Sequence, residues 1–577
     1  MDRHGIALLL EEIGSLLEIA GENRFKAKAF TSAARAIEKA DAEPAALVQN
    51  GGLESLPGIG PVTARVIREL VTTGRSNYYD DLRERTPAGL RDIMAVPGLG
   101  AKKASLLYQN LGISTLQELS EAVEAGRIAD VKGFGERTQQ KIAAGLKFVR
   151  SGAGRRRLSR AVESADRLLG MLRALPGTQQ IALAGELRRR LETVDGVDVI
   201  ASADEAACTA AVDAFMAMPA MLHPVREAPR LASARLADGL AVRFVCVPPQ
   251  SFVWALWLHT GSAAHVAEVG ALAQQRGFTL TPEGLLRNGA VVDLADETAL
   301  YKASGLQFVV PELREGRGEV AAAAAGTIPR LIERGDLRGT FHCHTTYSDG
   351  KATISELGEA ARERGWSYLG IADHSRNASY AGGLSVTDLE RQQREIDAWN
   401  DRHGDEVWLL KGVEADILVD GQLDYAADPG VLGSFDYVIA SVHSHFRMSR
   451  KEMTARLLRA LDDPHLTILG HLTGRLLLSR DGYDVDVMKV ITKAAERGVC
   501  IEINADPTRL DMDWRWWPAA RAAGVKCAIN PDAHSVRGLD NVQWGVDMAR
   551  KGGLEAGDVI NTKDVAALRA FLAARHG

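Results

Sequence analysis

The stretch Thr340-Phe341-His342-Cys343-His344 places two histidines two residues apart. We expect a β-strand here, and side chains two residues apart on a strand point to the same face. Two imidazoles on one face can share a single metal ion. The stretch therefore predicts a metal site that is built on a strand.

Further potential ligands follow later apolar runs in the same part of the chain, where nine of the 14 histidines lie between His342 and His534. The complete candidate set is His342, His344, Asp349, His374, Glu414, His443, His471, Asp532 and His534. Any one of them would more commonly be a buried core histidine or a helix-capping aspartate. Nine of them near strand ends instead predict a metal centre. Mixed nitrogen and oxygen ligands favour two or three divalent ions, Mn or Zn foremost and Fe also compatible.

Short apolar runs alternate with helical patterns from about residue 336 to residue 577. Strands are expected at 368–371, 407–410, 437–440, 467–469 and 500–503. This alternation predicts an α/β, barrel-like domain over residues 336–577.

Residues 1–150 are predicted to be helical, and they contain a turn that occurs three times. Each copy has the form Gly-apolar-Gly and precedes a predicted helix, at 62–70, 102–107 and 137–146. The glycines permit a tight turn, and the helix N-terminus offers free N–H groups to a phosphate. One copy alone would be an ordinary capped turn, but three copies resemble helix-hairpin-helix motifs, which bind DNA backbones. The predicted DNA-binding residues are Gly58, Gly60, Gly98, Gly100, Gly133, Gly135 and Lys102.

Composition excludes several classes of protein. The chain has 577 residues, about four times the usual length of one domain, and 46% of them are hydrophobic. This content excludes a largely disordered chain. The net charge of -6 excludes a globally basic nucleic-acid binder, although a local phosphate site is compatible with it. No run is long and apolar enough to predict a membrane span.

The cysteines and the N-terminus predict a cytoplasmic location. The five cysteines are odd in number and widely spaced, so neither a disulfide framework nor a zinc ribbon is expected. The N-terminus lacks the apolar core and cleavage site of a signal peptide.

The middle of the chain is marked by changes in composition at both ends. A Ser-Gly-Ala-Gly stretch at 151–154 predicts a boundary. Apolar runs at 180–184, 197–201 and 241–247 then alternate with helical patterns over residues 151–310. A polar stretch at 311–319 and an alanine run at 321–325 predict a linker over residues 311–335.

Residues 336–577 resemble a PHP phosphoesterase domain, whose nine-ligand pattern is complete here. The resemblance implies a trinuclear site on a distorted β/α barrel. Its first metal would bind His342, His344, Glu414 and Asp532, its second Asp349, His374 and His534, and its third His443, His471 and the bridging Glu414. Asn504, Arg509 and Arg475 lie in loop-like positions and are candidates for holding the substrate phosphate, with surface ion pairs as the alternative for the arginines.

The order of the regions resembles a bacterial family X DNA polymerase over essentially the whole chain. The resemblance implies a multidomain protein with a helical helix-hairpin-helix region, an α+β nucleotidyltransferase-like middle domain and the α/β PHP domain. Residues 184–189 and 192–198 lie where this family has its nucleotidyltransferase motif, and Thr260-Gly261-Ser262 matches a later turn. The implied partner is DNA, bound through its backbone with little sequence preference.

The polymerase positions depart from the family pattern. The family has two aspartates two residues apart, and here these positions are Gly196 and Asp198, with Asp195 one residue early. Asp195 could substitute only if a bulge re-aimed it. Ala241 replaces the third carboxylate, and Glu186 replaces a serine that contacts the triphosphate. The nucleotide-contacting and template-contacting residues align with Val266 and Gly270. We therefore expect a middle domain that keeps its fold and has lost polymerase activity.

Three hypotheses remain open at this point. The first is a metal-dependent DNA phosphoesterase that trims 3′ ends, as a 3′-5′ exonuclease, or cuts at abasic sites. The second is a DNA polymerase with an accessory nuclease, and the third is a non-catalytic DNA-binding scaffold. The sequence indicates no membrane and no obvious protein partner, and it leaves the natural substrate, the cellular metal and the oligomeric state open.

Overall fold

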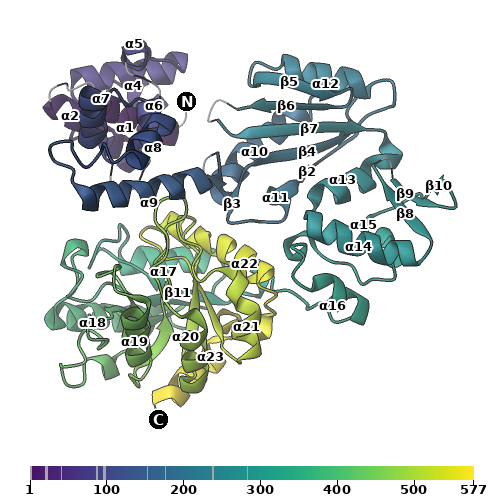
Figure 1. Ribbon diagram of the computed structural model, residues 1–577. Helices are drawn as coiled ribbons and strands as arrows, with labels where there is room; N and C mark the ends of the chain where they lie inside the picture. Colours follow the sequence, from purple (N-terminus) through teal and green to yellow (C-terminus); the bar gives the residue numbers. More distant parts are fainter. Residues whose placement is uncertain are drawn as a thin grey trace. The chain divides into compact units, whose positions relative to one another are not determined.

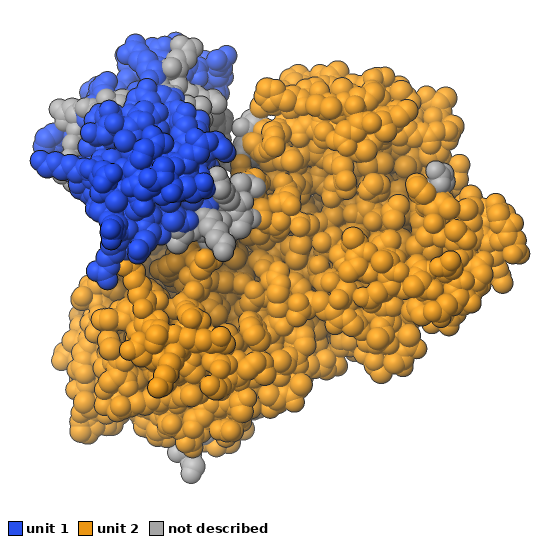
Figure 2. All heavy atoms as spheres, viewed as in Figure 1, with its two compact units in different colours: residues 1–153 blue, residues 154–577 orange. Residues whose placement is uncertain are grey.

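The computed structural model describes residues 3–576 apart from 20, 21, 23, 41, 86, 88, 95, 97, 98, 153, 176, 237, 238 and 283. The chain forms two compact units, residues 1–153 and residues 154–577 (Figure 2). Gly98, one of the predicted hairpin glycines, lies outside the described residues. Among those described, no helix combines the length and apolar character that a bilayer crossing requires. All five cysteines are buried free thiols.

The first unit is helical, as predicted (Figure 1). Its helices are α1 (Arg3–Ile19), α2 (Arg24–Lys39), α3 (Pro44–Gln49), α4 (Pro61–Thr73), α5 (Asn77–Arg85), α6 (Gly89–Met94), α7 (Ala101–Leu111), α8 (Leu116–Glu124) and α9 (Glu136–Gly152). Ile6, Leu10, Ile13 and Leu17 recur at helical spacing along α1 and are buried, so this helix turns one apolar face to the core.

The second unit begins with a five-stranded sheet of order β2-β4-β7-β6-β5. Its strands are β2 (Gln180–Ala184), β4 (Gly196–Ser202), β5 (Leu222–Ala228), β6 (Leu231–Arg235) and β7 (Ala241–Val247). Two shorter strands, β1 (Arg156–Arg157) and β3 (Thr193–Val194), pair beside it. The helices of this part are α10 (Leu158–Leu172), α11 (Gly185–Arg188) and α12 (Cys208–Ala217). The predicted strands at 180–184, 197–201 and 241–247 correspond to β2, β4 and β7, so the α+β expectation is confirmed.

A smaller, mostly helical part follows the sheet. It contains α13 (Phe252–Thr260), α14 (Ala263–Gln275), α15 (Glu297–Ala303) and a three-stranded sheet of β8 (Phe278–Thr281), β9 (Gly284–Arg287) and β10 (Ala290–Val291). Its core forms around buried aromatic side chains, among them Trp257 and Tyr301.

The segment predicted as a linker, residues 311–335, contains folded elements and several buried side chains. It forms the turn η3 (Pro311–Leu313) and the helix α16 (Glu319–Ala325). Arg314 has no exposed side-chain surface and donates to Glu297 at 2.8 Å. Glu319 is buried against His265 at 2.7 Å. The polarity of this segment therefore reflects buried ion pairs, which the sequence pattern alone did not distinguish from a solvated connector.

The C-terminal part is a parallel barrel of seven strands in sequential order. The strands are β11 (Gly339–Cys343), β12 (Tyr368–Ile371), β13 (Trp408–Asp416), β14 (Tyr437–Ser441), β15 (Leu466–Leu469), β16 (Cys500–Asn504) and β17 (Cys527–Asn530). The helices are α17 (Ile354–Glu363), α18 (Val386–His403), α19 (Arg450–Ala460), α20 (Val487–Arg497), α21 (Trp517–Ala522), α22 (Val542–Lys551) and α23 (Val565–His576).

The barrel is closed beyond the last strand. The N–H of His344 donates to the carbonyl of Ala533 at 2.8 Å, and the N–H of Ala533 donates to the carbonyl of His342 at 3.1 Å. These bonds join the end of β11 to the segment after β17. The predicted α/β barrel is therefore confirmed, and its C-terminal strand ends gather at one opening.

Candidate metal centre

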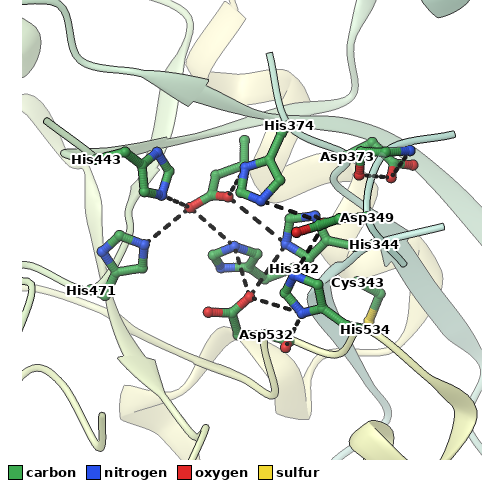
Figure 3. A network of polar contacts seen from close by, with 12 residues as sticks. His342, Cys343, His344, Asp349, Asp373, His374, His443, His471, Asp532 and His534 are labelled. Carbon is green, nitrogen blue, oxygen red and sulfur yellow. Dashed lines mark hydrogen bonds and ion pairs between the residues drawn. The ribbon is translucent and has the colours of Figure 1, made fainter. Parts of the chain in front are cut away.

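All nine predicted ligands lie at or just beyond the C-terminal ends of barrel strands. They are His342 and His344 at β11, Asp349 in the loop that follows, His374 after β12, Glu414 in β13, His443 after β14, His471 after β15, and Asp532 and His534 after β17. Figure 3 shows that the labelled side chains of this set converge. Because parallel strands end on one face of a barrel, ligands that are far apart in sequence meet there.

The two histidines of the first strand converge by a route that differs from the predicted one. The register between β11 and β12 shifts between Thr340 and Cys343, and His342 has a φ of 59°. This bulge replaces the regular strand on which the same-face argument depended. The His342 and His344 rings nevertheless lie 5.2 Å apart, so the bulge is the local device that aims both imidazoles inward.

Glu414 occupies the middle of the cluster. Its Oε1 lies 3.1 Å from Nε2 of His471, 3.2 Å from Nε2 of His443 and 3.3 Å from Nε2 of His342. Its Oε2 lies 2.8 Å from Nδ1 of His374. One carboxylate that faces four imidazoles has the arrangement of a bridging ligand.

Two aspartates complete the cluster on its other side. Asp532 Oδ1 lies 3.3 Å from Nε2 of His344, and Asp349 Oδ1 lies 3.2 Å from Nε2 of His534. Three groups have their ligand atoms within 4.8 Å of one another and could each hold an ion: His344, Asp349, His374 and His534; His342, His344 and Glu414; and His374, Glu414 and His443. The structure thus brings all nine predicted residues together.

The donor chemistry of this cluster fits a metal. Nε2 of His342 and both ring nitrogens of His344 are buried and make no hydrogen bond. A buried polar atom without a partner costs about 1–3 kcal/mol, so such atoms need a reason. These nitrogens face carboxylate oxygens without forming hydrogen bonds, which is the arrangement expected around a shared cation. Imidazole nitrogens combined with carboxylate oxygens suit a divalent transition metal.

The ionisation states also suit metal ligands. Burial opposes the charge of Glu414, but the imidazoles of His443 and His342 outweigh burial and hold the pKa of this carboxyl well below its usual value. Asp532 behaves in the same way beside His342. Burial and the neighbouring imidazoles lower the pKa of His344 to about 3. At neutral pH the carboxylates are therefore anionic and His344 is neutral. Against burial, the neighbouring carboxylates raise the pKa of His443 to about 10 and of His534 to about 9, so these imidazoles would release a proton when they bind a metal.

Two carboxylates behind the ligands were not predicted from the sequence. Glu502 accepts from Nδ1 of His342 at 2.6 Å and from the backbone N–H of His471 at 2.6 Å. Asp416 pairs with Nδ1 of His443 at 2.5 Å. A carboxylate on one ring nitrogen fixes the tautomer and directs the other nitrogen to the metal. The sequence feature that could have pointed to these two residues is an acidic side chain within a run of apolar residues predicted to be a strand.

The three residues predicted to hold phosphate differ in their surroundings. Arg509 lies 3.5 Å from Asp532, and its side chain is 21% exposed. Asn504 is fully buried and donates to Asp532 at 3.0 Å, so it supports a ligand. Arg475 donates to Asp513 at 2.7 Å and to the carbonyl of Arg509 at 3.0 Å. Of the three, Arg509 has the most exposed side chain beside the cluster, whereas Arg475 and Asn504 are engaged in hydrogen bonds within the protein.

Comparison with protein families matches the helical unit, the end of the middle domain and most of the barrel. Residues 1–76 match a helix-hairpin-helix domain, and residues 51–104 and 90–147 match a SAM-like helix-hairpin-helix tandem. Residues 255–315 match a DNA polymerase beta thumb, and residues 340–506 match a PHP domain.

Comparison with curated proteins gives a match over almost the whole chain. The DNA polymerase/3′-5′ exonuclease PolX of Bacillus subtilis (strain 168) is 34% identical over 576 residues, which cover 99% of each chain. The chain belongs to the bacterial family X DNA polymerases. A probable phosphatase of Thermoanaerobacter sp. (strain X514) is 29% identical over 249 residues, which cover 40% of this chain and 92% of that one. A probable phosphatase of Clostridium acetobutylicum is 29% identical over 221 residues, 36% of this chain and 84% of that one.

In this family X member, two strands approach closely in the segment that resembles the nucleotidyltransferase motif. Gly196 in β4 pairs with Ala241 in β7, and a Cβ on Gly196 would lie 2.7 Å from the Ala241 carbonyl oxygen. An aspartate at 196 would therefore require the strands to move apart. Asp198 accepts from Arg243 at 2.8 Å, so its charge is neutralised within the protein.

The other acidic residues of the motif are also paired. Arg155 donates to Asp195 at 2.8 Å and to Glu186 at 2.9 Å. Asp195 lies between β3 and β4 with 71% of its side chain exposed. Within the described ranges, the groups able to hold a metal are all in the C-terminal barrel. The middle domain has the expected α+β fold, and the carboxylates of Glu186, Asp195 and Asp198 are paired with arginines.

The hairpins of this family X member have open surroundings where the structure describes them. Gly60 and Gly100 are the N-caps of α4 and α7, and Gly58, Gly133 and Gly135 have φ values of 93°, 96° and 105°. A Cβ on Gly60, Gly100, Gly133 or Gly135 would meet nothing within 4 Å. Lys102 is exposed on the first turn of α7. Another backbone can therefore approach these helix N-termini closely.

Proposed function

We propose that the chain is a metal-dependent phosphoesterase that hydrolyses DNA phosphodiesters, as a 3′-5′ exonuclease or 3′-end-processing enzyme or at abasic sites, in DNA repair. The observation that carries the proposal is the convergence of nine imidazole and carboxylate ligands at the barrel opening. The Bacillus subtilis relative is a DNA polymerase/3′-5′ exonuclease, and this supports DNA as the substrate.

The proposed cofactors are two or three divalent metals, with Mn or Zn foremost and Fe compatible. The residues that would hold them are His342, His344, Asp349, His374, Glu414, His443, His471, Asp532 and His534. Metals bound there would acidify a water and neutralise charge on the phosphate.

The chain's own groups would orient the substrate. Arg509 would donate to the non-bridging oxygens of the phosphate, where negative charge accumulates during attack. Water adds to phosphorus and the P–O3′ bond breaks, which leaves a 3′-hydroxyl on the shortened strand. Glu502 and Asp416 would keep the ligand imidazoles aimed while this happens.

The helical unit would bind the DNA substrate. We propose that Gly58, Gly60, Gly98, Gly100, Gly133, Gly135 and Lys102 contact the DNA backbone, with affinity independent of sequence and sensitive to salt. Such a substrate would place the activity at the nucleoid in the bacterial cytoplasm.

We further propose that polymerase activity has been lost. Two-metal nucleotidyl transfer needs carboxylates on adjacent strands, and Gly196 and Ala241 occupy two of those positions. The paired charges of Asp198 with Arg243 and of Asp195 with Arg155 weigh against a metal there. DNA polymerase activity remains the second candidate, because the full-length relative is named for both activities.

A single assay separates the two candidates. The full-length protein with Mn and a 5′-labelled primer–template should shorten the primer and should not extend it when nucleotides are added. His344→Gln should abolish the shortening. Nucleotide incorporation that survives His344→Gln and disappears in Asp198→Ala would establish the polymerase instead. Metal analysis that finds no metal, together with no activity on adding Mn, would reject the phosphoesterase.

A further inference from the structure

A carboxylate of the middle domain contacts a loop of the barrel. Glu192 belongs to the segment that resembles the nucleotidyltransferase motif, and its side chain is 11% exposed. Its Oε2 accepts from the indole N–H of Trp514 at 2.9 Å, and its Oε1 accepts from Arg515 at 2.6 Å. Burial opposes the charge of Glu192, but Arg515 and Arg475 outweigh burial and lower its pKa to about 2. Glu192 is thus an anion that is held in place from the barrel side.

The contact continues toward the metal centre through charged groups. Arg515 also donates to Asp513 Oδ1 at 2.9 Å, and Asp513 Oδ2 accepts from Arg475 at 2.7 Å. Arg475 in turn donates to the backbone carbonyls of Arg509, at 3.0 Å, and Leu510. Each step lies within hydrogen-bonding distance, and the last one reaches the backbone of the loop rather than a side chain.

The last member of this series is the proposed phosphate contact. The backbone of Arg509 is held from one side by Arg475, and its guanidinium lies 3.5 Å from the ligand Asp532. Neighbouring residues of the loop add a bond from the N–H of Leu477 to the carbonyl of Thr508 at 2.6 Å. The position of the Arg509 side chain therefore depends on how this loop is anchored.

Arg515 is shared between two anions, Glu192 and Asp513. If Glu192 lost its charge, Arg515 would turn fully to Asp513, where it already lies 3.0 Å from the Oδ2 atom that Arg475 uses. Competition for that oxygen would weaken the anchor of Arg475 on the loop. A change at Glu192 in the middle domain would in this way alter the position of Arg509 beside the metal centre, although Glu192 does not contact the centre.

We propose that Glu192 is a positioning residue for the phosphoesterase and that it acts through Arg515, Asp513 and Arg475 to fix the loop carrying Arg509. The segment that resembles a polymerase motif would then serve the hydrolytic site. This inference rests on the proposed function for its kinetic readout, and the loop anchoring can be measured independently of it.

The test uses the full-length protein in two measurements. The first is Mn-dependent turnover of bis(p-nitrophenyl) phosphate, a small diester that needs no DNA grip. Glu192→Gln and Arg515→Gln should each lower kcat by roughly 3- to 30-fold, the range for coupling through such networks. Glu192→Gln should have no further effect in an Arg509→Gln background, because the effects of residues that act as one unit are not additive.

The second measurement is amide hydrogen exchange over residues 505–512 without metal. Exchange there should be faster in Glu192→Gln and in Arg515→Gln than in the wild type.

A matched control is Glu312→Gln. Glu312 pairs with Arg550 of α22 at 2.8 Å with 15% of its side chain exposed, and it lies outside the series. This variant should change neither kcat nor exchange over 505–512. Arg515 is 39% exposed, so Arg515→Gln remains informative if Glu192→Gln does not fold.

Two results would overturn the inference. One is unchanged exchange over 505–512 in both variants, even if their melting temperatures fall. The other is an equal loss of kcat from Glu192→Gln with and without Arg509, which would mean an independent effect. If the wild-type protein hydrolyses no diester, the proposed function fails, and the exchange measurement alone still decides whether Glu192 anchors the loop.

Discussion

At the scale of single residues, two carboxylates outside the nine candidate ligands hold ligand histidines in place. Glu502 accepts from His342, and Asn530 donates to the same carboxylate at 2.8 Å. Within β16, Glu502 lies between two apolar residues, Ile501 and Ile503. Its side chain therefore faces the opposite side of the strand from theirs. The carboxylate is therefore aimed into the barrel, where it orients a ligand.

We expect Glu502→Gln to weaken metal binding. The hydrogen-bond partners described for Glu502 all donate to it, and an amide would turn its own NH₂ toward one of them. Loss of such an outer partner commonly costs about 10- to 100-fold in metal affinity. Titration calorimetry of Mn into the metal-free protein would measure this.

The control for that prediction is Glu319→Gln, which removes a buried carboxylate from His265 in the middle domain. It should lower stability and leave Mn affinity unchanged. Equal Mn affinity in Glu502→Gln and the wild type would contradict the orienting role.

Tyr380 is an aromatic side chain at the rim of the metal centre. The residue is 72% exposed, and its ring centroid lies 6.4 Å from that of His374. Desolvation, with nearby carboxylates such as Asp416, raises the pKa of Tyr380 to about 12, so its hydroxyl stays protonated at neutral pH. An exposed ring at this place suits stacking against a terminal base.

Tyr380→Ala should raise KM for a DNA end by roughly tenfold, since stacking on one base contributes about 1–3 kcal/mol. Tyr380→Phe keeps the ring and should behave like the wild type. On an end whose last sugar lacks its base, Tyr380→Ala should have no effect. Equal losses on both kinds of end would exclude stacking, and a loss in Tyr380→Phe would point to the hydroxyl.

At the scale of elements, the sequence predicted the strands well and their local irregularities poorly. The run at 368–371 became β12 without change, because an apolar run between helical patterns has few other solutions. The bulge in β11 was not predictable, since the same letters suit a regular strand and only closure against Ala533 selects the bent form. The nine candidate ligands could be proposed from residue type and spacing, whereas Glu502 and Asp416 required knowing which strand faces touch.

The helix α22 carries a carboxyl that should make stability depend on pH. Burial raises the pKa of Asp547 to about 6, and the nearby Arg190 opposes this only in part. An unfolded aspartate ionises near pH 4, so between about pH 4 and 6 the folded state binds the extra proton. Stability should therefore fall as pH rises through this window and stay lowered above it.

Asp547→Asn should stabilise the protein above pH 6 by up to about 3 kcal/mol and have little effect below pH 4. Urea unfolding at pH 4 and pH 8 would measure the difference. Asp484→Asn is a control, since its side chain is 69% exposed and surface changes are usually within about 0.5 kcal/mol. A loss of stability at pH 8 in Asp547→Asn would mean that the ion pair with Arg190 outweighs burial.

At the scale of the whole molecule, we assign DNA binding to the helical unit and phosphodiester hydrolysis to the second unit. Among the described residues, the core of the helical unit runs from Ile6 to Leu146, within residues 1–153. The middle domain and the barrel, in contrast, share contacts such as the one between Glu192 and Arg515. The sequence could not predict that difference, because a polar segment has the same composition whether it is solvated or pairs with a neighbouring domain.

We therefore expect removal of residues 1–153 to separate the two roles. The shortened protein keeps the whole second unit, so its turnover of bis(p-nitrophenyl) phosphate should match that of the full chain. Its KM for long duplex DNA should rise by roughly a hundredfold, because three backbone contacts in one chain act together. The full chain should also lose DNA affinity steeply as salt increases, and the shortened protein should lose less.

A shortened protein that cuts long DNA with unchanged KM would show that the hairpins are structural and that DNA is bound at the barrel, around Arg509. A shortened protein with normal DNA binding but slow turnover of the small diester would instead show that the helical unit supports the metal centre itself.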